Sequence, residues 1–161
     1  MNVNRRLAVA VHVLALVDGG EWSLIHGPAT SERMARSVNT NPVVIRRILG
    51  SLRNAGLVTS RPGPGGGWRV TRPADEITLK DVFLALRDDD VFGMPLRTTD
   101  DGCPIGRCLP TLLAECFREV EAAIEAKLAT LTIADVVASA LAEGWGEQRN
   151  AIGPTAAAQP A

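Results

Sequence analysis

The stretch NTNPVVIRR, residues 39–47, lies shortly before RPGPGGG, residues 61–67, and together the two decide the fold. In the first, Asn41 is a good helix N-cap, and a proline at the first helical position loses no needed hydrogen bond. Apolar residues then recur at helical spacing. The second is rich enough in glycine and proline to mark the loop of a hairpin, whose strands we expect at residues 57–60 and 68–71.

Two further helices are predicted upstream of this pair. Residues 7–17 are almost all apolar and predict a buried first helix, which the glycines of DGG, residues 18–20, end. Residues 31–38 predict a short helix with Thr30 or Ser31 as its N-cap. The expected order of helix, helix, turn, helix and hairpin is that of a winged helix-turn-helix.

Two Thr-x-x-Asp patterns mark helix starts downstream of the hairpin. One is Thr78 with Asp81, and the other is Thr132 with Asp135. After the first of these helices we expect an acidic, mobile loop over residues 87–102.

A long helix is predicted for residues 109–129, because its apolar positions recur every three or four residues. They form one stripe: Leu109, Leu113, Cys116, Val120, Ile124 and Leu128. The stripe needs a partner, which is either a second copy of the chain or the chain's own winged domain. We favour the second copy, and hence a homodimer, because the N-terminal half supplies a core of its own.

Charge is divided unevenly along the 161 residues, whose net charge is −1. Residues 1–75 hold 10 arginines and 4 acidic residues, a net charge of +6. Residues 76–161 hold 7 basic and 14 acidic residues, a net charge of −7. Such asymmetry is typical of a nucleic-acid-binding half joined to a half that does not bind. Every cation of the basic half is an arginine, whose planar fork suits phosphate and guanine.

The sequence therefore predicts a mainly α-helical fold with a small β-hairpin: a winged helix-turn-helix followed by a long C-terminal dimerisation helix. Residues 1–75 are expected to form the DNA-binding domain, and residues 76–145 a helical dimerisation and sensing region. Residues 146–161, which are rich in alanine and proline near the end, are expected to be a disordered tail.

The predicted DNA contacts follow from this arrangement, because the second helix of a helix-turn-helix enters the major groove. We assign base reading to Arg46 and backbone anchoring to Arg47, although the reverse, or two solvated surface arginines, are alternatives. Glycines at the hairpin tip let the backbone approach DNA; a turn that merely needs positive backbone angles is the plain alternative. The full predicted set is Asn39, Thr40, Asn41, Val43, Arg46, Arg47, Arg61, Pro64, Gly65, Gly66, Gly67 and Arg69.

Other classes of protein find little support in the sequence. No Gly-Lys-Ser/Thr follows the glycines, which excludes a P-loop, and the context of a dinucleotide-binding fingerprint is missing. A cysteine-dependent hydrolase would need a histidine near a thiol, but the only histidines are His12 and His26, on the DNA-binding side. We therefore expect no enzyme. A winged helix reused as a protein-interaction module is the remaining alternative.

The first apolar run resembles a secretory signal, since Arg5 and Arg6 precede it. However, no small-x-small cleavage site follows, and the run is too short to span a bilayer. We expect a cytoplasmic protein without a membrane partner.

Several motifs together resemble the Rrf-two family (the BadM/Rrf-two superfamily) of bacterial transcription regulators. They are SVNTNPVVIRR (37–47), LRNAGLV (52–58), GPGGGW (63–68), DEITLKDV (75–82), CPIG (103–106) and LTIADV (131–136). The resemblance covers about residues 1–143. It implies a homodimer with a crossing long helix that binds a roughly two-fold symmetric double-stranded DNA operator, usually to repress.

The three cysteines, Cys103, Cys108 and Cys116, are too few and odd in number for a disulfide framework. Several family members bind an iron–sulfur cluster through three cysteines before the long helix, but the spacing C-x4-C-x7-C departs from their pattern. Cys116 falls on the apolar stripe, where cysteine is usually a small hydrophobe. His12 is expected to be a packed core histidine rather than a ligand. We expect no cofactor, with an iron–sulfur cluster as the alternative.

A redox or electrophile switch is the favoured role of the cysteines. Cys103 lies just ahead of the long helix, whose N-terminal dipole favours the thiolate. Oxidation there would pair it with Cys108, or oxidation or alkylation would shift the helix. Relatives without a cluster that carry a similar Cys-Pro-x-Gly include thiol-based sensors. Cysteines that sense nothing are the plain alternative.

Overall fold

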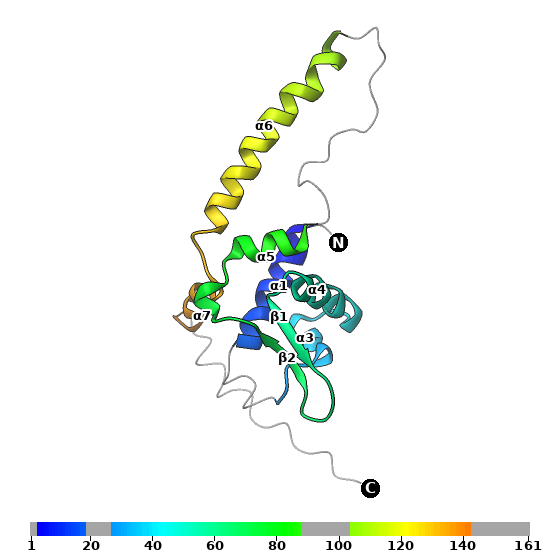
Figure 1. Ribbon diagram of the computed structural model, residues 1–161, viewed down its shortest axis with the longest axis vertical. Coiled ribbons are helices and arrows are strands. Elements are labelled where there is room, and N and C mark those ends of the chain that lie inside the picture. Colours follow the sequence, from blue (N-terminus) through cyan, green and yellow to red (C-terminus); the bar gives the residue numbers. More distant parts are fainter. Residues whose placement is uncertain (1–2, 19–26, 88–103, 143–161) are drawn as a thin grey trace.

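The computed structural model describes residues 3–18, 27–87 and 104–142 (Figure 1). Their helices are mostly those that the sequence predicts, and a two-stranded antiparallel hairpin lies among them. Of the expected loop over residues 87–102, residues 88–102 lie outside the described residues, as does the expected tail over residues 146–161. In chain order the elements are α1 (Val3–Asp18), α3 (Ser31–Val38), α4 (Pro42–Asn54), β1 (Val58–Arg61), β2 (Gly67–Val70), η1 (Ala74–Glu76), α5 (Leu79–Leu86), α6 (Pro104–Leu128) and α7 (Ile133–Ala140).

The turn between α3 and α4 is held by capping side chains. Thr30 is the N-cap of α3 and accepts a hydrogen bond from the backbone N–H of Arg33 at 3.4 Å. Asn39 ends α3 in the left-handed region, with φ of 53°. The Asn41 Oδ1 then accepts from the backbone N–H of Val43 at 2.8 Å and caps α4. Both short helices therefore begin where the sequence predicts.

The hairpin pairs Val58 with Val70, and Ser60 with Trp68. Its inner face packs on the helices, since Val58 is buried and Val70 and Trp68 lie against the core. A hydrogen bond of 3.0 Å from the Trp68 N–H to the Ala29 carbonyl ties β2 to the segment before α3. The wing is therefore fixed relative to the helix-turn-helix.

One core joins both halves of the chain. Buried aliphatic side chains of α1 and α4 meet Val82 and Leu86 of α5 and Ile133 of α7 in a single cluster. The expectation that the N-terminal half closes its own core is therefore wrong: α5 and α7 complete it. Backbone hydrogen bonds join their starts, from the Leu79 N–H to the Leu131 carbonyl at 2.8 Å and from the Ile133 N–H to the Ile77 carbonyl at 2.9 Å.

The long helix α6 begins earlier than predicted, at Pro104 rather than residue 109. Proline suits a first helical position, and the apolar repeat extends back through Ile105. The helix extends away from the body, which it meets at its C-terminal end beside α5 (Figure 1). Ion pairs hold this junction, from Lys80 to Glu125 at 3.2 Å and from Arg87 to Glu125 at 3.3 Å.

The predicted stripe of α6 divides into two parts. At the junction, Ile124 and Leu128 are half-buried. Farther out, Leu109 and Val120 remain 44% and 39% exposed, and Cys116 is exposed. The two alternative partners of the stripe therefore apply to different parts of one helix: the chain's own body covers the C-terminal part, and the outer part is left for a partner chain.

Candidate nucleic-acid interface

The helix α4 has two faces of opposite character. Ile45, Ile48, Leu49 and Leu52 are buried in the core. Near the N-terminus, Val43 is 49% exposed and the Arg46 side chain is 55% exposed, and Arg47 is exposed too. The helix therefore presents one apolar and two basic side chains to a ligand at the end that enters the major groove in a helix-turn-helix.

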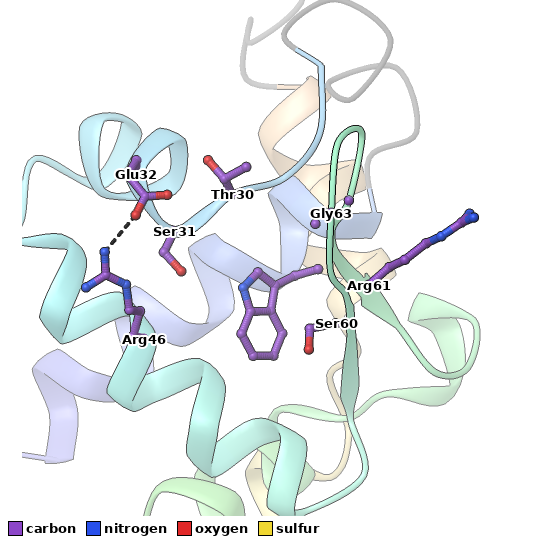
Figure 2. Close-up of a pocket in the computed structure, with 10 residues that line it drawn as sticks. Thr30, Ser31, Glu32, Arg46, Ser60, Arg61 and Gly63 are labelled. Atoms are coloured by element: carbon purple, nitrogen blue, oxygen red, sulfur yellow. Dashed lines mark hydrogen bonds and ion pairs between the residues drawn. The ribbon is translucent and has the colours of Figure 1, made fainter.

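An open cavity of about 320 Å³ lies between this end of α4, the start of α3 and the hairpin. Thr30, Ser31 and Glu32 line it from α3 and its cap, Arg46 lines it from α4, and Ser60 and Gly63 line it from the wing (Figure 2). The structure thus brings Arg46 and the wing, which the sequence predicted separately, to one concave surface.

Glu32 is an addition to this surface that sequence reasoning missed. Its Oε1 accepts a hydrogen bond from the Arg46 Nη2 at 2.7 Å (Figure 2). This bond is the main cause that lowers the pKa of Glu32, so its carboxylate is charged at neutral pH. Glu32 lies in the first turn of α3, and no local spacing in the sequence joins it to α4.

The basic residues of the wing lie on the opposite face of the hairpin. Register pairs Arg61 with Gly67 and Arg69 with Thr59, so Arg61 and Arg69 share one face, whereas Ser60 and Trp68 share the other. Both arginines are exposed, and Arg61 points away from Arg46 (Figure 2). The two predicted arginines of the wing are therefore available on its outer face, and Arg61 also contributes to the lining of the cavity.

The wing glycines have reasons within the loop itself. Gly63 and Gly65 have φ of 91° and 74°, the left-handed region that favours glycine. A Cβ on Gly66 would overlap the Arg61 carbonyl oxygen, and one on Gly67 would lie 3.1 Å from the Ala29 carbonyl oxygen. The plain alternative of a turn thus accounts for these glycines, so their contact with DNA, like that of Pro64, stays a prediction.

The polar residues of the turn also have structural tasks. The Asn39 N–H donates to the carbonyl of Arg36 at 3.2 Å, and the Thr40 N–H donates to that of Ala35 at 2.9 Å. Asn41 uses its side-chain oxygen as a cap, which leaves its Nδ2 to a ligand. These three residues fix where α4 begins, and any DNA contact they make comes in addition.

The cysteines are only partly described, since Cys103 lies outside the described residues. Cys108 lies within α6 rather than before it, and both Cys108 and Cys116 are free, exposed thiols. They stand about 12 Å apart along the helix axis at 1.5 Å per residue, too far for both to bind one metal ion at bonds of about 2.3 Å. The two described thiols therefore do not fit one iron site within a protomer.

His12 does not lie in the core, contrary to expectation. Its side chain is exposed, and its Nε2 lies 3.3 Å from the Ser37 Oγ of α3. His12 lies on an exposed edge of α1. The prediction was wrong because the apolar residues around it suggested that every face of the helix is buried. Within residues 3–18, 27–87 and 104–142, no group of three His, Cys, Asp or Glu side chains is placed to hold a metal ion.

A helix-turn-helix with a glycine-rich wing and exposed arginines defines a winged-helix DNA-binding protein. The family model Rrf2, described as an iron-dependent transcriptional regulator, matches residues 3–139. The chain therefore belongs to the Rrf2 family, the Rrf-two family of the sequence motifs, whose members are transcriptional regulators and not enzymes.

Known relatives agree with this assignment. YwnA of Bacillus subtilis, named as an HTH-type transcriptional regulator, is 37% identical over 135 residues, which is 84% of this chain and 96% of YwnA. A crystal structure of a DNA-binding protein is 34% identical with a TM-score of 0.63, covering 81% of this chain and 97% of that one. A transcriptional regulator from Lactobacillus plantarum shares the fold, with a TM-score of 0.71 at 24% identity, over 91% of this chain and 96% of that one. None of the helices in the described part of the chain is long and apolar enough to cross a membrane.

Proposed function

We propose that this chain is a homodimeric, sequence-specific regulator that binds a roughly two-fold symmetric DNA operator in the cytoplasm and represses transcription there. The observation that carries the proposal is the exposed N-terminal end of α4, which presents Val43, Arg46 and Arg47 and whose Arg46 shares a cavity with the wing. An apolar side chain suits the thymine methyl group, and an arginine suits guanine or phosphate. Repression is the usual action that the family resemblance implies.

The two arginines of α4 have different roles in DNA binding. Arg46 lines the concave surface and reads a base edge, whereas Arg47 follows it by about 100° around the helix and holds a phosphate. Arg61, at the edge of the cavity, and Arg69, on the same outer face of the wing, add phosphate contacts. Phosphate contacts fix the register of the protein, and Arg46 supplies the sequence preference.

The dimer forms through the outer part of α6. Ile105 and Leu112 are 72% and 63% exposed, and with Leu109, Cys116 and Val120 they follow helical spacing along one face. An apolar stripe of this length is costly to leave in water, and a second copy of the same helix covers it with matching spacing. A two-fold axis through α6 then sets two copies of α4 against the two half-sites of the operator.

The signal is proposed to act through thiols and without a cluster. Cys108 lies exposed among Ile105, Leu109 and Leu112, on the face assigned to the dimer. Oxidation or alkylation of a thiol there, or at Cys103, would change the packing of α6 and so the spacing of the two DNA-binding ends. Anaerobic purification tests the cofactor: a colourless protein agrees with the proposal, and a brown one with about one cluster per chain contradicts it.

A binding titration tests the DNA assignment with the full chain and a labelled duplex taken from directly upstream of its own gene. Affinity should fall steeply between about 50 and 200 mM salt, because phosphate contacts release counterions. Arg46→Ala should cost about tenfold or more and weaken the preference for this duplex over unrelated DNA. Arg118→Ala, a matched arginine exposed on α6, should bind as the wild type does. Wild-type affinity in the double variant Arg46→Ala/Arg47→Ala would contradict the proposal.

A further inference from the structure

The ion pair between Glu32 and Arg46 joins the two helices of the helix-turn-helix at their DNA-facing ends. The Oε1–Nη2 distance is 2.7 Å, and the side chains are 56% and 55% exposed, respectively. An exposed pair of this kind contributes little to folding, because water screens the charges and two long side chains lose freedom. A role in stability therefore does not account for an acid placed in the middle of a basic surface.

The carboxylate occupies a place where DNA phosphate would otherwise be favoured. Glu32 lies in the first turn of α3, and the N-terminus of a helix attracts anions such as phosphate. It also lines the cavity between α3, α4 and the wing (Figure 2). The hydrogen bond from Arg46 lowers the pKa of Glu32, which keeps the negative charge there at neutral pH. A phosphate that approached Arg46 would meet this charge at close range.

A guanine edge meets a different situation. The bond to Glu32 uses the Nη2 of Arg46, and within the described residues no other hydrogen bond of the Arg46 guanidinium is formed. A guanidinium carries five N–H donors, and a bidentate contact to guanine O6 and N7 needs two of them. Arg46 can therefore keep its bond to Glu32 while it contacts guanine, an uncharged ligand that the carboxylate does not repel.

We propose that Glu32 is a positioning residue for sequence readout, which holds Arg46 toward base edges and keeps it from phosphates. This inference rests on the proposed function, since it assigns a partner to the residue that reads DNA. Removal of the charge at Glu32 frees Arg46 for the sugar–phosphate backbone. Binding to unrelated DNA then strengthens, and discrimination weakens.

Competition titrations with the full chain test the proposal, using the duplex that wild-type protein selects from a random-sequence pool and a scrambled duplex of equal length. Glu32→Gln should raise affinity for the scrambled duplex about three- to tenfold and lower the ratio of selected to scrambled binding by a similar factor. For scrambled DNA, the slope of log affinity against log salt concentration should become steeper by about 0.9, the contribution of one added phosphate contact. Glu119→Gln, which removes an exposed acid from α6, should leave the ratio unchanged.

The double variant Glu32→Gln/Arg46→Ala separates positioning from a general effect of charge. If Glu32 acts through Arg46, the double variant should show the same ratio of selected to scrambled binding as Arg46→Ala alone. An unchanged ratio and salt slope in Glu32→Gln, or a further loss of ratio in the double variant, would overturn the inference while the DNA assignment stands. A wild-type chain that binds both duplexes equally would overturn the proposed function, and this inference with it.

Discussion

The N–H of Trp68 donates a hydrogen bond of 3.0 Å to the carbonyl of Ala29, so the second strand of the wing is anchored directly before α3. Gly67, next to Trp68 in β2, lies so close to this segment that a Cβ would press on the backbone of Ala29. The angle between wing and helix-turn-helix is thus a property of the backbone. Gly67 and Trp68 line the same cavity as Arg46, so this anchoring fixes one of its walls.

Gly66→Ala should disturb the wing, because the added Cβ would overlap the Arg61 carbonyl oxygen, a backbone atom that cannot move aside alone. We expect DNA affinity to fall about tenfold, with a loss of about 1–3 kcal/mol in the free energy of unfolding. Urea titration and anisotropy of a labelled duplex measure the two effects. Gly50→Ala is the control: Gly50 lies in α4 with open space around it, and alanine there should stabilise by about 0.5–1 kcal/mol. Unchanged DNA affinity in Gly66→Ala would show that DNA binding does not depend on the shape of the wing loop.

The N-caps of α5 and α7 should be coupled. Thr78 and Thr132 each form a complete capping box, and the two residues pair as an antiparallel bridge. Replacement of either by alanine should cost about 1 kcal/mol in the free energy of unfolding. The cost of the double variant should differ from the sum, because the two caps share one backbone contact. Thr111→Ala, on an exposed face of α6, should cost nothing. Strict additivity in chemical denaturation would argue against the coupling.

Leu112→Glu should dissociate the proposed dimer. Leu112 is 63% exposed in the single chain, and dimer formation would bury it, so a charge there loses its hydration without gaining a partner. Sedimentation equilibrium should give a dimer for the wild type and a monomer at the same concentration for the variant. Ala122→Glu, on another exposed face of α6, should remain a dimer. A dimeric Leu112→Glu would place the interface elsewhere.

Stability should decline as the solution is acidified through the ordinary pKa of histidine, and His12 should account for part of the decline. Although His12 is exposed at the surface, partial burial of its side chain lowers its pKa from the usual 6.5, so the folded chain favours the neutral ring. The unfolded chain then binds more protons, and the contribution of His12, present above pH 6.5, is lost as the pH falls toward the folded value. His12→Asn should show a smaller drop in Tm between pH 7.5 and pH 5.5 than the wild type. An equal drop in both proteins would exclude this role.

Local sequence signals predicted the helices and strands, but they could not predict contacts between residues that are distant in the sequence. Asn41-Pro42 and the two Thr-x-x-Asp patterns located helix starts because capping depends on residues within one turn. The ion pair of Glu32 and Arg46 depends on the packing of two helices, which no periodicity encodes.

The long helix shows the same limit. Its apolar repeat predicted a helix, but the repeat could not tell the half that meets α5 from the half that remains exposed. That division follows from the junction at Glu125, where side chains of α5 and its C-cap converge. The histidine prediction failed for a related reason, since an apolar run does not reveal which edge of a helix stays in solvent.

Selection of bound duplexes from a random-sequence pool by the purified full chain tests the central claim most directly. The account predicts a two-fold symmetric site, with half-sites about 34–36 Å apart or a multiple of that distance, and a guanine preference that Arg46→Ala abolishes. Failure to enrich any sequence, or enrichment of the same site by Arg46→Ala/Arg47→Ala, would contradict the assignment of α4 as the helix that reads DNA.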